Sequence, residues 1–146
     1  MDKVRIGIVG LGNIGQIHAK SLLEGKIERG VLTAVADAFP DKLGEYEEKG
    51  LKAYGSGEDL IASGEIDALM IATPHFQHPT LGIAALDAGL HVMVEMPISA
   101  PMPNSPPSEN WVEALCITTA LSIAVMKRRA ASASSVRIAS VWCELC

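Results

Sequence analysis

The stretch Val4-Arg5-Ile6-Gly7-Ile8-Val9-Gly10-Leu11-Gly12-Asn13-Ile14-Gly15 decides the fold class of this chain. Its first half is a short run rich in β-branched residues, which is typical of a buried parallel strand, and the run ends at a cluster of glycines. From Asn13 onward, the apolar residues Ile14, Ile17 and Leu22 are spaced to share one face of a helix that fades near Gly25. The sequence therefore predicts a strand, a glycine-rich turn and a helix in direct succession.

Strands and helices alternate along the chain as far as residue 95. We expect further strands at 31–36, 52–54, 68–72 and 91–95, and helices at about 41–49, 56–63 and from 78 to 89. This alternation predicts an α/β fold with a doubly wound parallel sheet of Rossmann type. The length of 146 residues, of which 49% are hydrophobic, suits one domain with a sizeable core.

The glycines at positions 10, 12 and 15 form a G-x-G-x-x-G pattern, which is meaningful because it follows a predicted strand and opens a predicted helix. Gly10 would permit the tight turn, Gly12 would let a pyrophosphate reach the backbone, and Gly15 would let the helix pack closely on the strand. We therefore expect Gly10, Gly12, Asn13, Ile14 and Gly15 to bind a dinucleotide at the helix N-terminus. The alternative is an ordinary turn between a strand and a helix.

An acidic residue follows the second predicted strand. Asp37 lies 22 positions after Gly15, close to the spacing of about 20 expected for the acid that binds the adenosine ribose hydroxyls. We expect NAD and disfavour NADP, because the carboxylate repels a 2′-phosphate and residues 38–40 offer no lysine or arginine to receive one. The alternative is that Asp37 only caps a turn.

The segment after the fourth predicted strand carries polar side chains. Ligands of open α/β sheets bind at the carboxyl ends of the strands, so Thr73 and His78 are candidates to line the nicotinamide side of the site. Pro74 and Pro79 suit a rigid loop that begins a helix equally well. His18 lies inside the first predicted helix, where we expect it to pack.

Residues Val4 to Ala100 resemble the N-terminal domain of the Gfo/Idh/MocA oxidoreductases. The stretches that carry the resemblance are Ile6–His18, Ala34–Asp37, Ile71–Pro74 with His78, and Ala85–Pro97. The resemblance implies NAD(P)-dependent oxidation of a sugar, a cyclitol or a related alcohol by hydride transfer. It also places Pro74 and Glu95 among the cofactor-binding residues.

The chain departs from this family at the position that carries the catalytic lysine. The family has a Glu-Lys-Pro motif whose lysine assists proton transfer, whereas this chain has Met96 between Glu95 and Pro97. A thioether has no proton to exchange, so acid–base assistance worth about 100- to 10,000-fold would be absent. Family members also continue into a substrate domain, and nothing from Pro101 onward resembles it. We therefore expect no catalytic residue in this chain.

The last third of the sequence changes character. Four prolines within 101–108 indicate a boundary at about 101–110, which leaves a Rossmann domain at 1–100 and an unassigned tail at 111–146. We expect a buried helix over 111–126, which is shorter than the roughly 20 residues needed to span a bilayer. The abrupt change is typical of a truncation or a shifted reading frame.

Composition narrows the classes of partner. The formal net charge of −5 disfavours binding to nucleic acid or to an anionic membrane surface. The N-terminal residues do not form a signal peptide, so we expect a cytoplasmic protein. Cys116, Cys143 and Cys146 are expected to be reduced thiols, and we expect no metal site because the pair at 143 and 146 lacks a second pair of ligands.

Three hypotheses follow. The favoured one is a truncated family member that binds NAD without hydride transfer. The others are one subunit of a split dehydrogenase and a stand-alone NAD sensor whose tail is ordered by the nucleotide. A fragment of this kind would expose apolar surface, so we also expect self-association.

Overall fold

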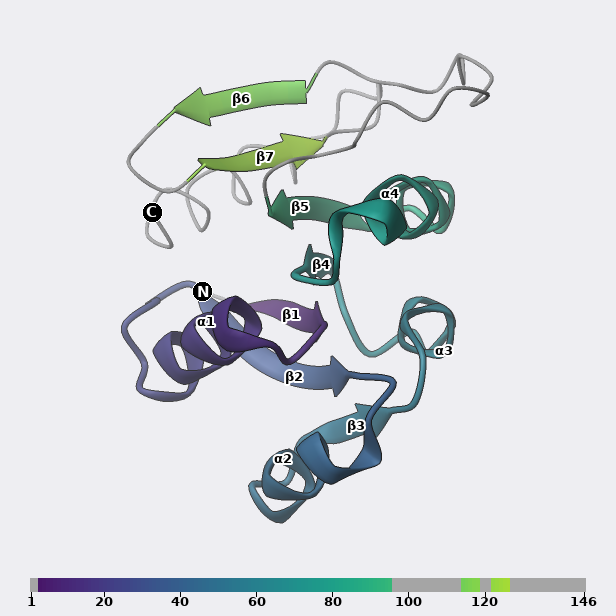
Figure 1. The fold of residues 1–146 in the computed structure, drawn as a ribbon. Coiled ribbons are helices and arrows are strands. Elements are labelled where there is room, and N and C mark those ends of the chain that lie inside the picture. Colours follow the sequence, from purple (N-terminus) through teal and green to yellow (C-terminus); the bar gives the residue numbers. More distant parts are fainter. Residues whose placement is uncertain (1–2, 96–113, 119–121, 127–146) are drawn as a thin grey trace.

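The computed structural model of the chain describes residues 3–95, 114–118 and 122–126. Its centre is a parallel sheet (Figure 1). The five parallel strands are β1 (Val4–Val9), β2 (Gly30–Ala36), β3 (Lys52–Tyr54), β4 (Ala68–Ile71) and β5 (His91–Glu95). They stand in the order β3-β2-β1-β4-β5, as a doubly wound fold requires. The fold class predicted from the sequence is confirmed.

Helices cover both faces of this sheet. In Figure 1, α1 and α2 lie on one face, and α3 and α4 lie on the other. Local sequence sets where they begin, because the Ser56 hydroxyl accepts a hydrogen bond from the Asp59 amide at 3.1 Å and caps α3, and Pro79 lies in the first turn of α4. The helices are α1 (Asn13–Leu23), α2 (Gly44–Glu48), α3 (Gly57–Ala62) and α4 (His78–Asp87).

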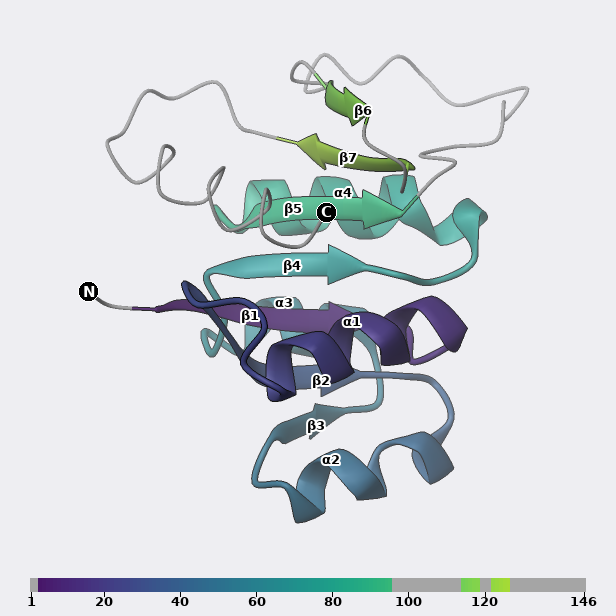
Figure 2. The same cartoon turned by 90° about the vertical axis from the view of Figure 1, so that its left-hand side faces the viewer.

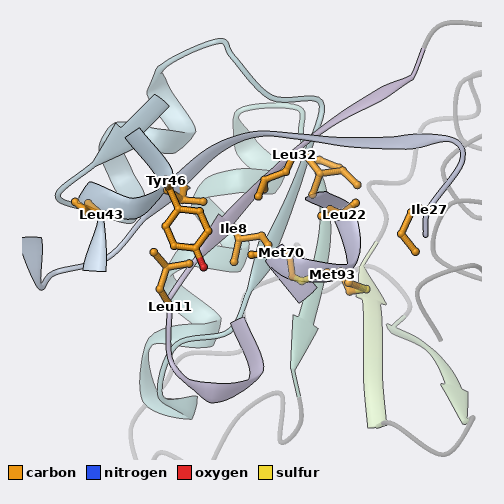
Figure 3. Packing of buried hydrophobic residues seen from close by; sticks show 13 residues of the cluster. Ile8, Leu11, Leu22, Ile27, Leu32, Leu43, Tyr46, Met70 and Met93 are labelled. Atoms are coloured by element: carbon orange, nitrogen blue, oxygen red, sulfur yellow. The ribbon is translucent and has the colours of Figure 1, made fainter. Parts of the chain in front are cut away.

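Two apolar layers hold the helices to the sheet. Alternate residues of β1 point to opposite faces, so Ile8 packs in the layer under α1 and α2 while Val9 packs in the layer under α3 and α4. Figure 3 shows Ile8 and Met70 of the sheet in the first layer with Tyr46 of α2. Each large side chain buried in this way stabilises the fold by about 1.5–3 kcal/mol. Burial on both faces explains why the strands are continuous apolar runs.

The expected helix over 41–49 is shorter and divided. A 3₁₀ turn, η1 (Pro40–Lys42), precedes α2. Pro40 stands at the first position of this turn, where a fixed φ and a missing N–H are tolerated. Because of this turn, Lys42 lies close to Asp37, the residue that follows β2.

The expected helix over 111–126 is wrong. The chain forms strands β6 (Ala114–Thr118) and β7 (Ser122–Met126) there, and they extend the sheet in the order β5-β7-β6. Figure 2 shows β7 running opposite to β5. The stretch contains isoleucine, threonine and valine, which favour strands, and the edge of β5 offers unpaired backbone groups to β7. Among the described residues the sheet is therefore mixed, because β7 runs antiparallel to both of its neighbours, β5 and β6.

Several sequence predictions fall outside the described residues. These are the role of Met96, the proline-rich boundary at 101–110 and the state of Cys143 and Cys146.

Within the described part of the chain, no helix combines the length and the apolar character that crossing a bilayer requires.

Candidate dinucleotide site

The sheet order reverses next to β1, and a cavity of about 840 Å³ lies at the carboxyl ends of the strands there. Chain segments that leave β1, β2, β3 and β4 all contribute to its wall. This is the crevice in which open α/β sheets bind ligands. The predicted site residues in the lining are Gly10, Gly12, Asp37, Thr73 and Pro74.

The glycine turn has the geometry that the sequence predicts. Gly10 has a φ of +91°, and a Cβ atom there would lie 2.7 Å from the carbonyl carbon of Ala72. A Cβ atom on Gly15 would lie 1.9 Å from the carbonyl oxygen of Gly10. Only glycine fits at these two positions, because a side chain on Gly10 would collide with the backbone after β4 and one on Gly15 would push α1 away from the glycine turn.

The N-terminus of α1 faces an open space. A Cβ atom on Gly12 would meet no atom within 4 Å, and no side chain caps the helix. The first turn therefore presents the backbone N–H groups of Asn13, Ile14 and Gly15, which have no partner inside the helix. The first turn also holds no acidic residue that would repel an anion. This arrangement suits a pyrophosphate.

Asp37 is buried beside the glycine turn, with 7% of its surface exposed. One carboxylate oxygen, Oδ2, accepts a hydrogen bond from the Leu11 amide at 2.7 Å. The other, Oδ1, accepts one from the Phe39 amide at 2.9 Å. The second bond is the turn-capping role that the sequence left open, and the first ties the carboxylate to the dinucleotide loop. Asp37 does both.

The structure adds a cation that the sequence argument missed. Lys42 lines the same cavity, and its Nζ lies 3.4 Å from Oδ2 of Asp37. The same ammonium lies 5.0 Å from the ring centroid of Phe39. Residues 38–40 contain no lysine or arginine, but the η1 turn returns residue 42 to the carboxylate. The sequence argument considered residues 38–40 only, and the cation near Asp37 comes from residue 42 instead.

Thr73 and His78, both predicted to line the site, lie differently around the loop after β4. Thr73 and Pro74 line the cavity. His78 is 1% exposed and does not line it, and its Nε2 lies 2.7 Å from the carbonyl oxygen of Thr73. His78 therefore holds the loop from beneath. Oγ1 of Thr73 is buried and has no hydrogen-bond partner among the described residues.

Glu95, at the end of β5, does not line the cavity. Its Oε1 lies 2.7 Å from Nε2 of His18, a buried residue of α1. His18 packs as expected, but it also holds this carboxylate, which the sequence argument did not predict. Among the described residues no group of His, Cys, Asp or Glu side chains is arranged to hold a metal ion.

Residues 4–105 match a family model described as an oxidoreductase family with an NAD-binding Rossmann fold. The chain belongs to the Gfo/Idh/MocA family. The resemblance drawn from the sequence is thereby confirmed, and the family description supports NAD as the cofactor.

Relatives of known name agree with this assignment. The chain is 40% identical over 98 residues to a myo-inositol 2-dehydrogenase of Thermotoga maritima. The scyllo-inositol dehydrogenase of Lactobacillus casei, solved with NAD(H) and scyllo-inositol, has a TM-score of 0.64 at 34% identity. The WlbA dehydrogenase of Bordetella pertussis, solved with NADH and UDP-GlcNAcA, has a TM-score of 0.60 at 35% identity.

The three matches cover similar fractions of this chain and of the relatives. They extend over 66–67% of this chain but only 29–30% of the length of the three relatives. The matched segment of this Gfo/Idh/MocA chain corresponds to the NAD-binding domain, and the relatives are about three times as long as that segment.

Proposed function

We propose that this chain binds NAD(H) in the cavity at the carboxyl ends of β1, β2 and β4. The observation that carries the proposal is that Gly12, the residue before α1, and Asp37 line one cavity. The Asp37 carboxylate also accepts a 2.7 Å hydrogen bond from the Leu11 amide of the glycine turn. Donors for a pyrophosphate and an acceptor for a ribose hydroxyl then stand on the same wall.

The residues present fit the dinucleotide in two further ways. The open space at Gly12 leaves room for phosphate oxygens next to the α1 amides. The buried hydroxyl of Thr73, which lacks a partner among the described residues, would gain one from a bound ligand. Pro74 would line the nicotinamide side with Thr73, while His78 and Glu95 would support the walls of the site without touching the cavity.

When bound, NAD supplies a hydride acceptor, and the chain's own residues decide whether a substrate can use it. We propose that this chain does not catalyse hydride transfer, because Met96 cannot exchange a proton where the family motif has lysine. The relatives' names indicate cyclitols or sugars as the substrate class of a full-length family member. The chain spans 29% of the length of the Thermotoga relative.

Binding and turnover are tested separately. We expect NADH to quench or shift the fluorescence of the purified chain in a saturable manner, and Asp37→Ala to weaken that binding. NAD reduction with myo-inositol or scyllo-inositol should remain at background for the wild type. Failure of a folded sample to bind NADH would contradict the binding proposal. Turnover by the wild type would contradict the proposed inactivity.

Exposed apolar side chains on α1 favour a second proposal, association with another chain. Ile14, Ile17 and Leu23 are 43%, 58% and 40% exposed, and apolar surface of this kind is often covered by a partner. Self-association would explain it, as would a separate subunit that completes a split dehydrogenase. Light scattering should detect self-association that decreases in Ile17→Lys, whereas a monodisperse wild-type monomer would contradict it.

A further inference from the structure

Lys42 occupies a position from which it can affect the choice between NAD and NADP. Its Nζ lies 3.4 Å from Oδ2 of Asp37, the oxygen that also accepts the Leu11 amide hydrogen bond. Lys42 is the only residue with a cationic side chain among the described residues that line the cavity, where the anionic side chains are those of Asp37 and Glu58. Any negative charge that a ligand brings to the Asp37 subsite would meet this ammonium first.

The local fold keeps the ammonium at the subsite without burying it. The η1 turn returns Lys42 toward the end of β2, and the side chain is 36% exposed. The ring of Phe39, 5.0 Å from Nζ, provides an attractive surface on one side of the ammonium. An ammonium carries three donors on a flexible stem, so Lys42 can stay near the carboxylate and still donate to another acceptor.

We propose that Lys42 is a specificity-determining residue that limits the discrimination against a 2′-phosphate by Asp37. A carboxylate alone binds the ribose hydroxyls and repels the phosphate of NADP, whereas a nearby cation accommodates that phosphate. In this subsite the Lys42 ammonium pairs with the Asp37 carboxylate, so it partly neutralises the repulsion between that carboxylate and a 2′-phosphate. The ammonium can also donate a hydrogen bond to the phosphate. NAD stays the preferred cofactor, and NADP binds with a moderate penalty. This inference rests on the proposed NAD site.

The test compares Kd values for NADH and NADPH on the full chain by fluorescence titration. Lys42→Met keeps most of the aliphatic stem and removes the charge. We expect it to raise the NADPH Kd roughly tenfold, the usual effect of losing one charge-assisted hydrogen bond, while the NADH Kd changes less than about twofold. Lys42→Arg should restore NADPH binding to within about threefold of the wild type, because it restores the cation.

Lys49→Met is the matched control. Lys49 also lies over an aromatic ring, with Nζ 5.6 Å from the centroid of Tyr46, but it pairs with Glu45 and does not line the cavity. Its loss should leave both Kd values unchanged. Asp37→Asn with Lys42 intact should narrow or invert the preference for NADH, and adding Lys42→Met should abolish that gain.

The possible results distinguish a failure of the role proposed for Lys42 from a failure of the proposed NAD site. Saturable NADH binding with an unchanged NADPH-to-NADH ratio in Lys42→Met would overturn the role of Lys42 and leave the NAD site intact. An equal loss of both cofactors would also overturn it, because it would indicate a general structural role. If the folded wild type binds neither NADH nor adenosine 5′-monophosphate, the NAD site itself is wrong and the inference is overturned with it.

Discussion

His18 and Glu95 join the helix of the glycine turn to the last parallel strand. Nε2 of His18 in α1 lies 2.7 Å from Oε1 of Glu95 at the end of β5, although 77 positions separate them in the sequence. The His18 side chain is 7% exposed and that of Glu95 is 20% exposed. This contact holds Glu95, the residue before Met96, against α1, the helix that follows the glycine turn of the candidate dinucleotide site.

Replacing His18 should destabilise the domain. His18→Ala leaves the Glu95 carboxylate largely buried without its imidazole partner, so we expect the free energy of unfolding to fall by about 1–3 kcal/mol. Urea denaturation followed by circular dichroism would measure it. Lys20→Ala on the same helix is the control, because the Lys20 side chain is 75% exposed. A double-mutant cycle with Glu95→Gln should show coupling, and additive effects would rule out the contact.

The two glycines at the start of α1 should respond differently to alanine. Gly15→Ala places a Cβ atom 1.9 Å from the Gly10 carbonyl oxygen, so we expect a stability loss of about 1–3 kcal/mol or more. Gly12→Ala meets no atom within 4 Å and should change stability by no more than about 1 kcal/mol. It should nevertheless weaken NADH binding, because the methyl group fills the space proposed for phosphate oxygens.

Thermal unfolding and NADH titration of both variants check this pair. Gly44→Ala is the control, since its Cβ atom also meets nothing within 4 Å and Gly44 lies in α2, outside the cavity lining. A Gly12→Ala chain that binds NADH like the wild type would place the pyrophosphate elsewhere.

Local patterns were enough to predict the five parallel strands but not β6 and β7, whose formation depends on a distant element. β1 and β5 have the predicted bounds because each is an apolar run that ends at a clear change in sequence character. The apolar stretch at 111–126 lacks a period of two or of 3.6, so only the free edge of β5 reveals it as strands. Here the tertiary context decided the secondary structure.

The candidate site divides in the same way. The glycine turn and Asp37 could be predicted because their spacing along the chain reflects the geometry of one strand–helix–strand unit. Lys42 was missed because its distance from Asp37 depends on the 3₁₀ turn Pro40–Lys42, whereas the sequence analysis expected a helix to begin at about residue 41. A proline three residues after the acid is the local signal that could have indicated this turn.

The unpaired hydroxyl of Thr73 should affect both the stability of the chain and its stabilisation by NADH. Thr73→Val keeps the shape of the side chain and removes a buried polar atom that has no partner among the described residues. We expect the chain without cofactor to gain about 1 kcal/mol in stability. The stabilisation by NADH should become smaller, because the ligand can no longer satisfy the hydroxyl.

Thr33→Val is the opposite case and serves as the control for Thr73→Val. Oγ1 of Thr33 lies 3.1 Å from the carbonyl oxygen of Glu65, to which it donates a hydrogen bond. Its removal should destabilise the chain. Thermal shift assays with and without NADH compare the two variants, and a Thr73→Val chain that loses stability without cofactor would show that its hydroxyl is satisfied by the protein.

The ion pair between Arg5 and Asp67 predicts a pH dependence of stability. The Arg5 guanidinium, with Nη2 2.7 Å from Oδ1 and Nε 3.2 Å from Oδ2, donates hydrogen bonds that hold the pKa of Asp67 below its ordinary value of 3.8. Because the folded state lowers this pKa, the pair contributes its full stabilisation above about pH 3.8 and loses it as the pH falls through the folded-state pKa.

Asp67→Asn should therefore lower the Tm at pH 7, by about 1–4 °C because both side chains are partly exposed to solvent. The difference from the wild type should stay constant down to pH 4 and then shrink toward zero as Asp67 of the wild type is protonated. Differential scanning calorimetry between pH 2.5 and 7 measures both trends. Asp87→Asn, at the exposed end of α4, should show neither. A Tm difference that does not shrink at all between pH 4 and pH 2.5 would mean that Asp67 stabilises the fold through something other than its charge.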